Sequence, residues 1–264
     1  MQDSIFLSKR FYITGIICLG IAILSLLSGC GKNIKNSDAV LNKSVNIALN
    51  NGNWEEALSY AKLATKTDPN NIDAQVMYSI ALENTGNKDE AIKNLKKIVA
   101  TQPKNFLAQL SLGKLLYTKK DYEGAYDHLA NAYNLKPSDI NTLILFAQCS
   151  AKLHAQNTEK LFLKISKTAQ FKNKPELYNN MGVYYAETKN YSEAIKYLIK
   201  AYKISPENPF IIANLGIFCD KYLNQPKKAK YFYRKFISLS LDNSIYDTKR
   251  KEFSNRLKEL AKNS

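Results

Sequence analysis

The chain has 264 residues and a formal net charge of +15, and 45% of its residues are hydrophobic and 11% aromatic. That supply of aliphatic and aromatic side chains is enough for a packed domain, which excludes a wholly disordered protein. The excess of lysine would suggest a nucleic-acid partner in a cytoplasmic protein. Because the lysines are spread along the chain, we expect a solvated basic surface and no nucleic acid, with contact to anionic lipid headgroups as the alternative.

Residues 1–30 have the pattern of an export signal. Lys9 and Arg10 precede an uncharged, mostly apolar stretch at residues 11–27, and the segment ends in Leu27-Ser28-Gly29-Cys30. A positive start, an apolar stretch and a small-residue cleavage site are typical of a secretory signal. The ending resembles the lipobox of bacterial lipoproteins, which implies that Cys30 is lipidated and becomes the new N-terminus. An uncleaved N-terminal anchor is the alternative.

Both interpretations place the residues after this segment outside the cytoplasm. The lipoprotein resemblance implies three acyl chains, and two already make membrane attachment stable. Gly31 follows the cysteine, where lipoproteins retained at the inner membrane of enterobacteria have aspartate. The resemblance therefore favours the periplasmic side of the outer membrane over the inner membrane. Residues 31–36 are expected to form a short polar tether.

Alanine, proline and glycine recur with a period of 34 residues after this tether. The positions 34 apart are Ala57, Ala91 and Ala125, Pro69, Pro103 and Pro137, and Gly182 and Gly216. The pattern resembles the tetratricopeptide repeat, which implies an all-α, right-handed solenoid of about six helix pairs over residues 37–243. The windows are about 38–71, 72–105, 106–139, 140–174, 175–208 and 209–243.

Two windows depart from the repeat. In the fourth, Glu159 stands where a packing alanine is expected, and no proline closes the window. The sixth has an extra residue around Asn224–Pro226 and uses Ala229 as its packing alanine. Glycine in the first helix and alanine in the second are expected to let paired helices approach closely. The glycines are Gly113, Gly182 and Gly216, and the alanines are Ala57, Ala91, Ala125 and Ala194.

Residues 244–264 are expected to form a C-terminal capping helix, because a solenoid must close its last apolar surface. Phe253, Leu257, Leu260 and Ala261 recur at helical spacing. The basic residues expected on the opposite side are Lys249, Arg250, Lys251, Arg256 and Lys258. A separate basic docking helix is the alternative.

The sequence predicts no metal site, no cofactor and no catalytic centre. His128 and His154 fall in different repeats, and no cysteine or histidine pair has zinc-site spacing. Phosphate-binding loops, nucleophile elbows and zincin helices do not occur in the sequence. Cys149 and Cys219 fall two repeats apart, so we expect small buried fillers and not a disulfide.

In the tetratricopeptide family, first helices line a concave groove along which partners lie. The resemblance assigns ten residues to this groove, namely Asn42, Asn46, Met77, Ile80, Lys114, Tyr117, Gln148, Asn179, Asn180 and Asn214. The family's carboxylate clamp for peptide C-termini is not expected, because Met77, Leu107 and Ser111 stand at places that it requires. The aliphatic residues along these helices have an alternative role as core, since apolar helical stripes usually pack inside a protein.

These features predict a membrane-anchored scaffold that binds other envelope proteins or their peptide segments. A lipobox followed by six repeats is similar to the type IV pilus biogenesis lipoproteins (pilotins), and Asn214–Cys219 resembles a helix of that family. That resemblance implies a role in secretin assembly. The alternatives are an adaptor for peptidoglycan hydrolases or envelope proteases, and a lipoprotein that binds glycans or small ligands directly.

Overall fold

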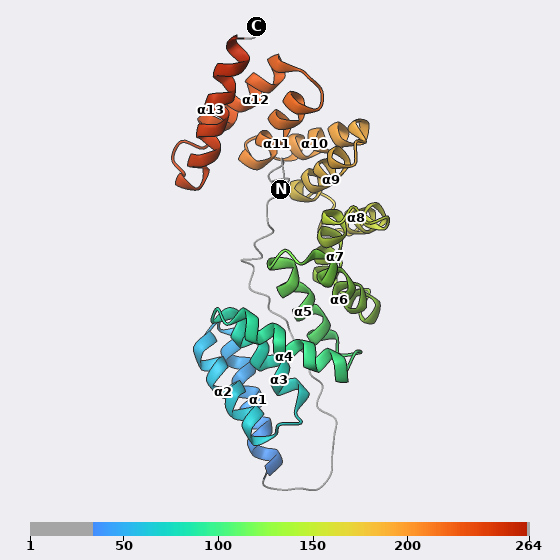
Figure 1. The fold of residues 1–264 in the computed structure, drawn as a ribbon, viewed down its shortest axis with the longest axis vertical. Coiled ribbons are helices and arrows are strands. Elements are labelled where there is room, and N and C mark those ends of the chain that lie inside the picture. The colour runs from blue at the N-terminus through green and yellow to red at the C-terminus, as the bar shows by residue number, and fades with distance from the viewer. Residues whose placement is uncertain (1–33, 263–264) are drawn as a thin grey trace. The chain divides into compact units, whose positions relative to one another are not determined.

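The computed structural model describes residues 34–262, which fold into thirteen α-helices and one 3-10 helix (Figure 1). The helices are α1 (Ile34–Asn50), α2 (Trp54–Thr67), α3 (Ile72–Asn84), α4 (Lys88–Thr101), α5 (Phe106–Thr118), α6 (Tyr122–Leu135), α7 (Ile140–Lys152), α8 (Thr158–Ser166), α9 (Pro175–Glu187), α10 (Tyr191–Ile204), α11 (Pro209–Lys221), α12 (Pro226–Leu239), the 3-10 helix η1 (Ser244–Tyr246) and α13 (Asp247–Lys262). The predicted signal segment and Cys30 lie outside the described residues. Among the helices described, none has the length and apolar composition needed to cross a membrane.

The predicted all-α fold of about six helix pairs and a capping helix is confirmed. The first helices α3, α5, α7, α9 and α11 begin at residues 72, 106, 140, 175 and 209, where the windows were expected to begin. The first window differs, because α1 begins at Ile34 and so includes residues 34–36 of the expected tether. Pro69, Pro103, Pro137 and Pro206 each follow the end of a second helix by two residues, since proline cannot continue a helix.

Side-chain caps start several first helices at the same place in the repeat. Asn71, Asn105 and Asp139 accept hydrogen bonds from the backbone nitrogen three residues later, at 3.0, 2.9 and 2.7 Å. Asn208 caps α11 in a related way. The fifth window has Lys174 at this place, and α9 instead begins with Pro175, whose fixed φ favours a first helical position. Each such cap satisfies one backbone donor that the first helical turn leaves unpaired.

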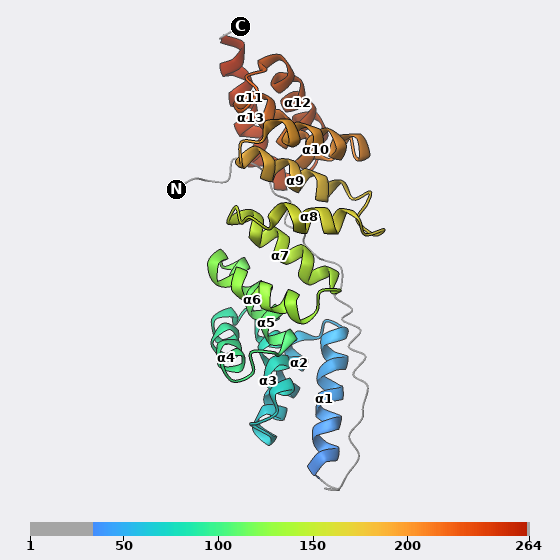
Figure 2. The ribbon, with the colours of Figure 1, turned by 90° about the vertical axis from the view of Figure 1, so that its right-hand side faces the viewer.

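The chain divides into two compact units between Leu153 and His154. The first contains α1 to α7, in which each helix packs against the next, and Figure 2 shows α1 beside α2 and α3. The second contains α8 to α13, with the α9–α10 and α11–α12 hairpins stacked and α13 against α12 (Figures 1 and 2). The division falls inside the fourth helix pair, the one whose sequence departs most from the repeat.

The second helix of that fourth pair is short. Helix α8 has 9 residues, whereas α6 and α10 have 14 each. Glu159 is exposed on α8, and burial and this nearby carboxylate raise the pKa of the Tyr185 hydroxyl. A charged side chain cannot replace a buried alanine at a close helix contact. The Glu159 side chain is therefore exposed and lies near the Tyr185 hydroxyl.

The glycines predicted to allow close packing do so. A Cβ atom at Gly113 would lie 2.7 Å from Leu129 Cγ, and one at Gly182 would lie 2.6 Å from Leu198 Cγ. At Gly216 it would lie 2.8 Å from Tyr233 Cδ1. The alanines of the second helices, Ala57, Ala91, Ala125, Ala194 and Ala229, are fully buried. The absence of side-chain bulk therefore sets the separation of the paired helices.

Helix α13 covers the end of the second unit. Phe253 is buried, with its ring centroid 4.3 Å from that of Tyr233 and 5.0 Å from that of Phe236. Arg256 was expected on the solvent side but forms a bidentate ion pair with Asp220 of α11, at 2.8 and 2.9 Å. Burial alone would raise the pKa of the Asp220 carboxyl, but hydrogen bonds from Arg256 and Tyr233 lower it below its ordinary value. Ala261, expected on the packed side, is exposed.

Replacing Gly182 with alanine tests the close contact between α9 and α10. If there were room for the methyl group, alanine would stabilise the helix by about 1 kcal/mol. Because the new Cβ would lie 3.1 Å from the Ala194 carbonyl oxygen as well as against Leu198, we expect overpacking to outweigh that gain. The free energy of unfolding, measured by urea denaturation with circular dichroism, should fall by about 1 kcal/mol.

The matched control is Ser192→Thr, which adds one methyl group at an exposed position of α10. Its free energy of unfolding should stay within about 0.5 kcal/mol of the parent value. A Gly182→Ala variant more stable than the parent would contradict the packing argument.

Candidate functional site

The first helices of the unit that ends at Leu153 carry one residue each at equivalent places of the repeat. Asn46, Ile80, Lys114 and Gln148 are successively 34 residues apart, on α1, α3, α5 and α7. Neighbouring first helices contact one another in this order, so the four residues follow each other across the unit. All four side chains are half-buried. We call them the central row.

A second row lies one helical turn later on the same helices. It consists of Leu49, Glu83, Tyr117 and Ala151, again 34 residues apart and all half-buried. Residues three or four apart on a helix share one face, so the two rows adjoin. The two rows together are called the first-helix surface. Glu83 and Leu49 were not predicted, although they lie 34 and 68 residues before Tyr117, at the same place of the repeat.

A third row lies one helical turn before the central row and belongs partly to the core. It consists of Asn42, Val76, Leu110 and Ile144. Val76 is 1% exposed and Ile144 is 7% exposed, whereas Asn42 and Leu110 at the equivalent places are half-buried. The buried aliphatics thus take the packing role that the sequence analysis left open for them. Asn42 adds a buried amide oxygen, Oδ1, which has no hydrogen-bond partner within residues 34–262.

The central row and the second row are joined by an ion pair. Lys114 Nζ on α5 lies 3.0 Å from Glu83 Oε1 on α3. The Glu83 side chain is only 11% exposed, while that of Lys114 is 39% exposed. An ammonium group has three donors, so Lys114 can bind a further acceptor on its solvent side while it neutralises Glu83.

Tyr117 stands one turn beyond Lys114 on α5. Its ring centroid lies 5.4 Å from that of Tyr122 at the start of α6, in a tilted arrangement. Aromatic pairs of this kind hold their rings in place. Tyr117 therefore presents a fixed, half-buried ring next to a charged group, which suits it to contact an apolar side chain of a partner.

The structure revises the role of Met77. Its side chain is 6% exposed and packs with Val45 and Ala61 in a core cluster. Val45 belongs to α1 and Ala61 to α2, so Met77 packs between helices and does not line the first-helix surface.

Asn179 and Asn214, in the second unit, are also revised. They are 1% and 0% exposed, and Asn214 Nδ2 donates a hydrogen bond of 2.9 Å to Asn179 Oδ1. The bond joins the first helices α9 and α11, so these amides hold two repeats together. Asn180 remains half-buried, and its Oδ1 atom has no hydrogen-bond partner in the described part of the chain.

The two cysteines and His128 are held by packing. Cys149 and Cys219 are free and buried, and burial raises the pKa of the Cys149 thiol to about 12. The Nδ1 atom of His128 lies 2.7 Å from Gln109 Oε1, and burial lowers the pKa of this histidine. Among residues 34–262, no three His, Cys, Asp or Glu side chains gather as metal ligands would.

Comparison with known families finds tetratricopeptide repeats in both units. The family model described as tetratricopeptide repeat matches residues 48–115, and a second model of that description matches residues 175–208. A model described as anaphase-promoting complex, cyclosome, subunit 3 matches residues 84–159. No curated protein sequence matches the chain.

Several solved structures are similar in fold. PilF of Pseudomonas aeruginosa is 18% identical, with a TM-score of 0.61, over 84% of this chain and 99% of that one. YrrB, described as a tetratricopeptide-repeat protein with an unusual peptide-binding site, is 20% identical, with a TM-score of 0.60, over 67% and 92%. MamA is 19% identical, with a TM-score of 0.55, over 66% and 94%. At these identities the likeness shows the fold.

Replacing Asn179 with alanine distinguishes a packing role from a binding role. The substitution removes the acceptor of the buried Asn214 amide, and a buried donor without its acceptor costs about 1–3 kcal/mol. We expect the free energy of unfolding in urea to fall by that amount.

The neighbouring substitution Asn180→Ala is the control, because Asn180 Oδ1 has no partner to lose among the described residues. Asn180→Ala should lower the free energy of unfolding by less than half as much as Asn179→Ala does. Equal stability of the parent and the Asn179→Ala variant would show that the Asn179–Asn214 bond does not hold the two repeats together.

Proposed function

We propose that this tetratricopeptide-repeat chain is a membrane-anchored scaffold that holds an extended segment of a partner protein along its first-helix surface. The observation that carries the proposal is the central row, in which four successive first helices each place one half-buried residue at the same position. The fold likeness to YrrB, described as having a peptide-binding site, supports the same kind of function.

The dimensions suit an extended segment. Packed helices lie about 8–10 Å apart, and an extended chain rises about 3.3 Å per residue. Every third residue of the segment would therefore meet the next first helix. Four helices would engage roughly ten residues of the partner on these spacings.

The chemistry of the row indicates what such a segment contains. Asn46 and Gln148 stand at its two ends, and amide side chains can both donate to and accept from a main chain. Ile80 offers an apolar contact near one end. Lys114 and the Tyr117 ring adjoin on α5, where an acidic or carbonyl group would meet the ammonium and an apolar side chain would meet the ring.

The anchored location rests on the sequence. The Leu27-Ser28-Gly29-Cys30 ending supports a lipid on Cys30, and Gly31 favours the periplasmic side of the outer membrane over the inner membrane. Within that location we favour a role in type IV pilus or secretin assembly. The resemblance to pilotins in overall organisation and the fold likeness to PilF support it. The proposed activity is binding, without bond-making chemistry.

Replacing Cys30 with alanine tests the anchor. The thiol is the expected site of acylation, so labelled palmitate should enter the parent protein and be absent from the variant. A Cys30→Ser variant, which also lacks the thiol, should behave in the same way. Palmitate labelling that persists in both variants would rule out lipidation at this position.

Replacing Lys114 and Tyr117 together with alanine tests the binding surface. The parent protein, purified with its anchor from its own envelope, supplies the partner by co-purification. An aromatic residue near the centre of an interface commonly contributes about 2 kcal/mol or more, so the apparent affinity should fall roughly thirtyfold. Helicity should be retained, while the melting temperature should fall because Glu83 loses the cation that neutralises it. A Glu83→Gln variant with the same two substitutions should recover that stability without recovering partner capture.

The control removes two charged side chains from a second helix, which lies outside the first-helix surface. Lys96 and Lys97 are exposed on α4, and Lys96→Ala with Lys97→Ala should leave partner capture within about twofold of the parent, as expected for exposed rim charges. Loss of capture in this control, with capture retained in the Lys114 and Tyr117 variant, would place binding on the outer side of the second helices.

A further inference from the structure

Among residues 41–262, the three most exposed large hydrophobic side chains lie close together in sequence. Ile245 is 75% exposed, Leu241 is 62% exposed and Tyr231 is 55% exposed, and Leu239 between them is 41% exposed. All four belong to α12 or to the connection between α12 and the capping helix α13. None of the four belongs to the first-helix surface.

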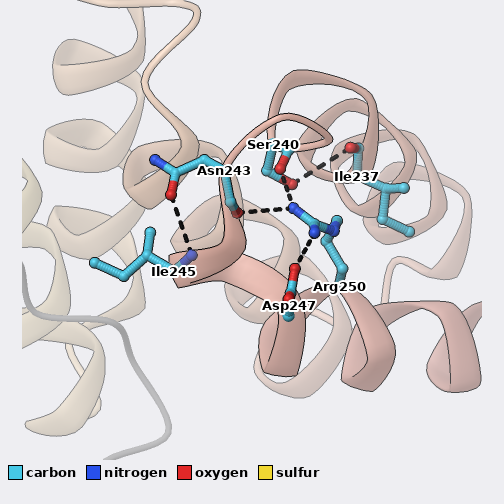
Figure 3. Close-up of polar contacts among 6 residues, drawn as sticks. All are labelled: Ile237, Ser240, Asn243, Ile245, Asp247 and Arg250. Atoms are coloured by element: carbon cyan, nitrogen blue, oxygen red, sulfur yellow. Dashed lines mark hydrogen bonds and ion pairs between the residues drawn. The ribbon is translucent and has the colours of Figure 1, made fainter.

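The connection is held in shape by the groups next to these side chains. Arg250 of α13 donates to the carbonyl oxygens of Ser240 and Asn243, the latter at 3.0 Å, and it pairs with the carboxylate of Asp247 (Figure 3). The Asn243 side chain accepts a hydrogen bond of 3.1 Å from the backbone nitrogen of Ile245. Figure 3 shows the Ile245 side chain pointing away from Arg250.

The connection is fixed at both ends, at Ser240 and at Tyr246. Ser240 is 1% exposed, and the Tyr246 ring packs 5.6 Å from that of Phe236 and 5.5 Å from that of Phe210. Between these fixed points, Leu241 and Ile245 face solvent. The structure therefore holds two aliphatic side chains outward on an ordered connection, where an unconstrained loop could turn them inward.

The helix that leads into the connection is basic on its exposed side. Helix α12 contains five lysines and arginines and no acidic residue. Lys227, Lys228, Tyr231 and Arg234 are exposed at helical spacing, while Ala229, Tyr233 and Phe236 face the core. Of the acidic side chains nearby, Asp247 and Glu252 pair with Arg250 and Lys249, and Asp220 pairs with Arg256. Glu207 lies near Lys235, and Asp242 is in the connection.

We propose that this surface, made of the exposed side of α12 with Leu239, Leu241 and Ile245, contacts an anionic phospholipid bilayer. Aliphatic side chains that protrude can enter the acyl boundary, and a tyrosine beside them suits the headgroup level. The exposed lysines and arginine of α12, which leads into this connection, attract anionic headgroups. The high exposure of Ile245 and Leu241 favours entry into a deformable lipid surface.

The contact proposed here does not depend on the lipid at Cys30 or on partner binding by α1 to α7. It would give the second unit its own attachment to the membrane. Since phospholipid affinity through basic residues is electrostatic, it should weaken with salt and with loss of anionic lipid.

A single tryptophan used as a depth probe tests the proposal on the full-length protein. Trp54 is the lone tryptophan of the chain and lies in the other unit, so the native protein is the reference. The test variant is Trp54→Phe with Ile245→Trp, which places the tryptophan at the most exposed aliphatic position. Both proteins are reconstituted into vesicles of phosphatidylglycerol and acyl-brominated phosphatidylcholine in equal parts, and quenching of tryptophan fluorescence by the bromines is measured.

We expect quenching at position 245 to exceed that of Trp54 by about twofold or more, and to fall to the Trp54 level in vesicles of brominated phosphatidylcholine alone. The variant that adds Lys227→Gln, Lys228→Gln and Arg234→Gln should lose the excess quenching even with phosphatidylglycerol present. Trp54→Phe with Leu241→Trp repeats the measurement if the first variant does not fold. Quenching no greater than that of Trp54 at both positions would overturn the proposal, and would leave this surface to a protein partner.

Discussion

The close approach of paired helices at Gly113, Gly182 and Gly216 is the contact on which the rest of the fold depends. At each of these positions, the neighbouring helix fills the space that a Cβ atom would need. In the first and second pairs, Val45 and Ser79 stand at this place, and the close contact comes from the buried alanines of the second helices. Because the separation of the helices is fixed in this way, equivalent residues of successive first helices come into line. The rows of the first-helix surface follow from that alignment.

The fourth helix pair shows what happens when this contact is missing. Glu159 occupies the place of the buried alanine, α8 has only 9 residues, and the chain divides into compact units just before it. In a solenoid, each repeat is stabilised chiefly by its neighbours, so a pair without its close contact is a weak point. The Glu159 carboxylate instead lies near Tyr185, in the next first helix, and raises the pKa of its hydroxyl together with burial.

Helix positions could be predicted from the sequence because small residues and prolines act locally and recur. The starts of α3, α5, α7, α9 and α11 agree with a phase fixed by Ala, Gly and Pro alone. The ion pair between Arg256 and Asp220 joins residues 36 apart, and no local pattern indicates it. Burial of Met77 and Asn179 was also missed, because a change of one residue along a helix turns a side chain from the surface to the core.

The central row is informative because its members differ while their positions do not. Packing positions repeat the same residue type from pair to pair, as Ala57, Ala91 and Ala125 do, since the same helix contact must form each time. Asn46, Ile80, Lys114 and Gln148 occupy one place of the repeat with an amide, an aliphatic, a cationic and a second amide side chain. Packing does not require this order. A chain lying across the four helices would meet these groups in a fixed sequence, so the row distinguishes one direction of a bound segment from the other.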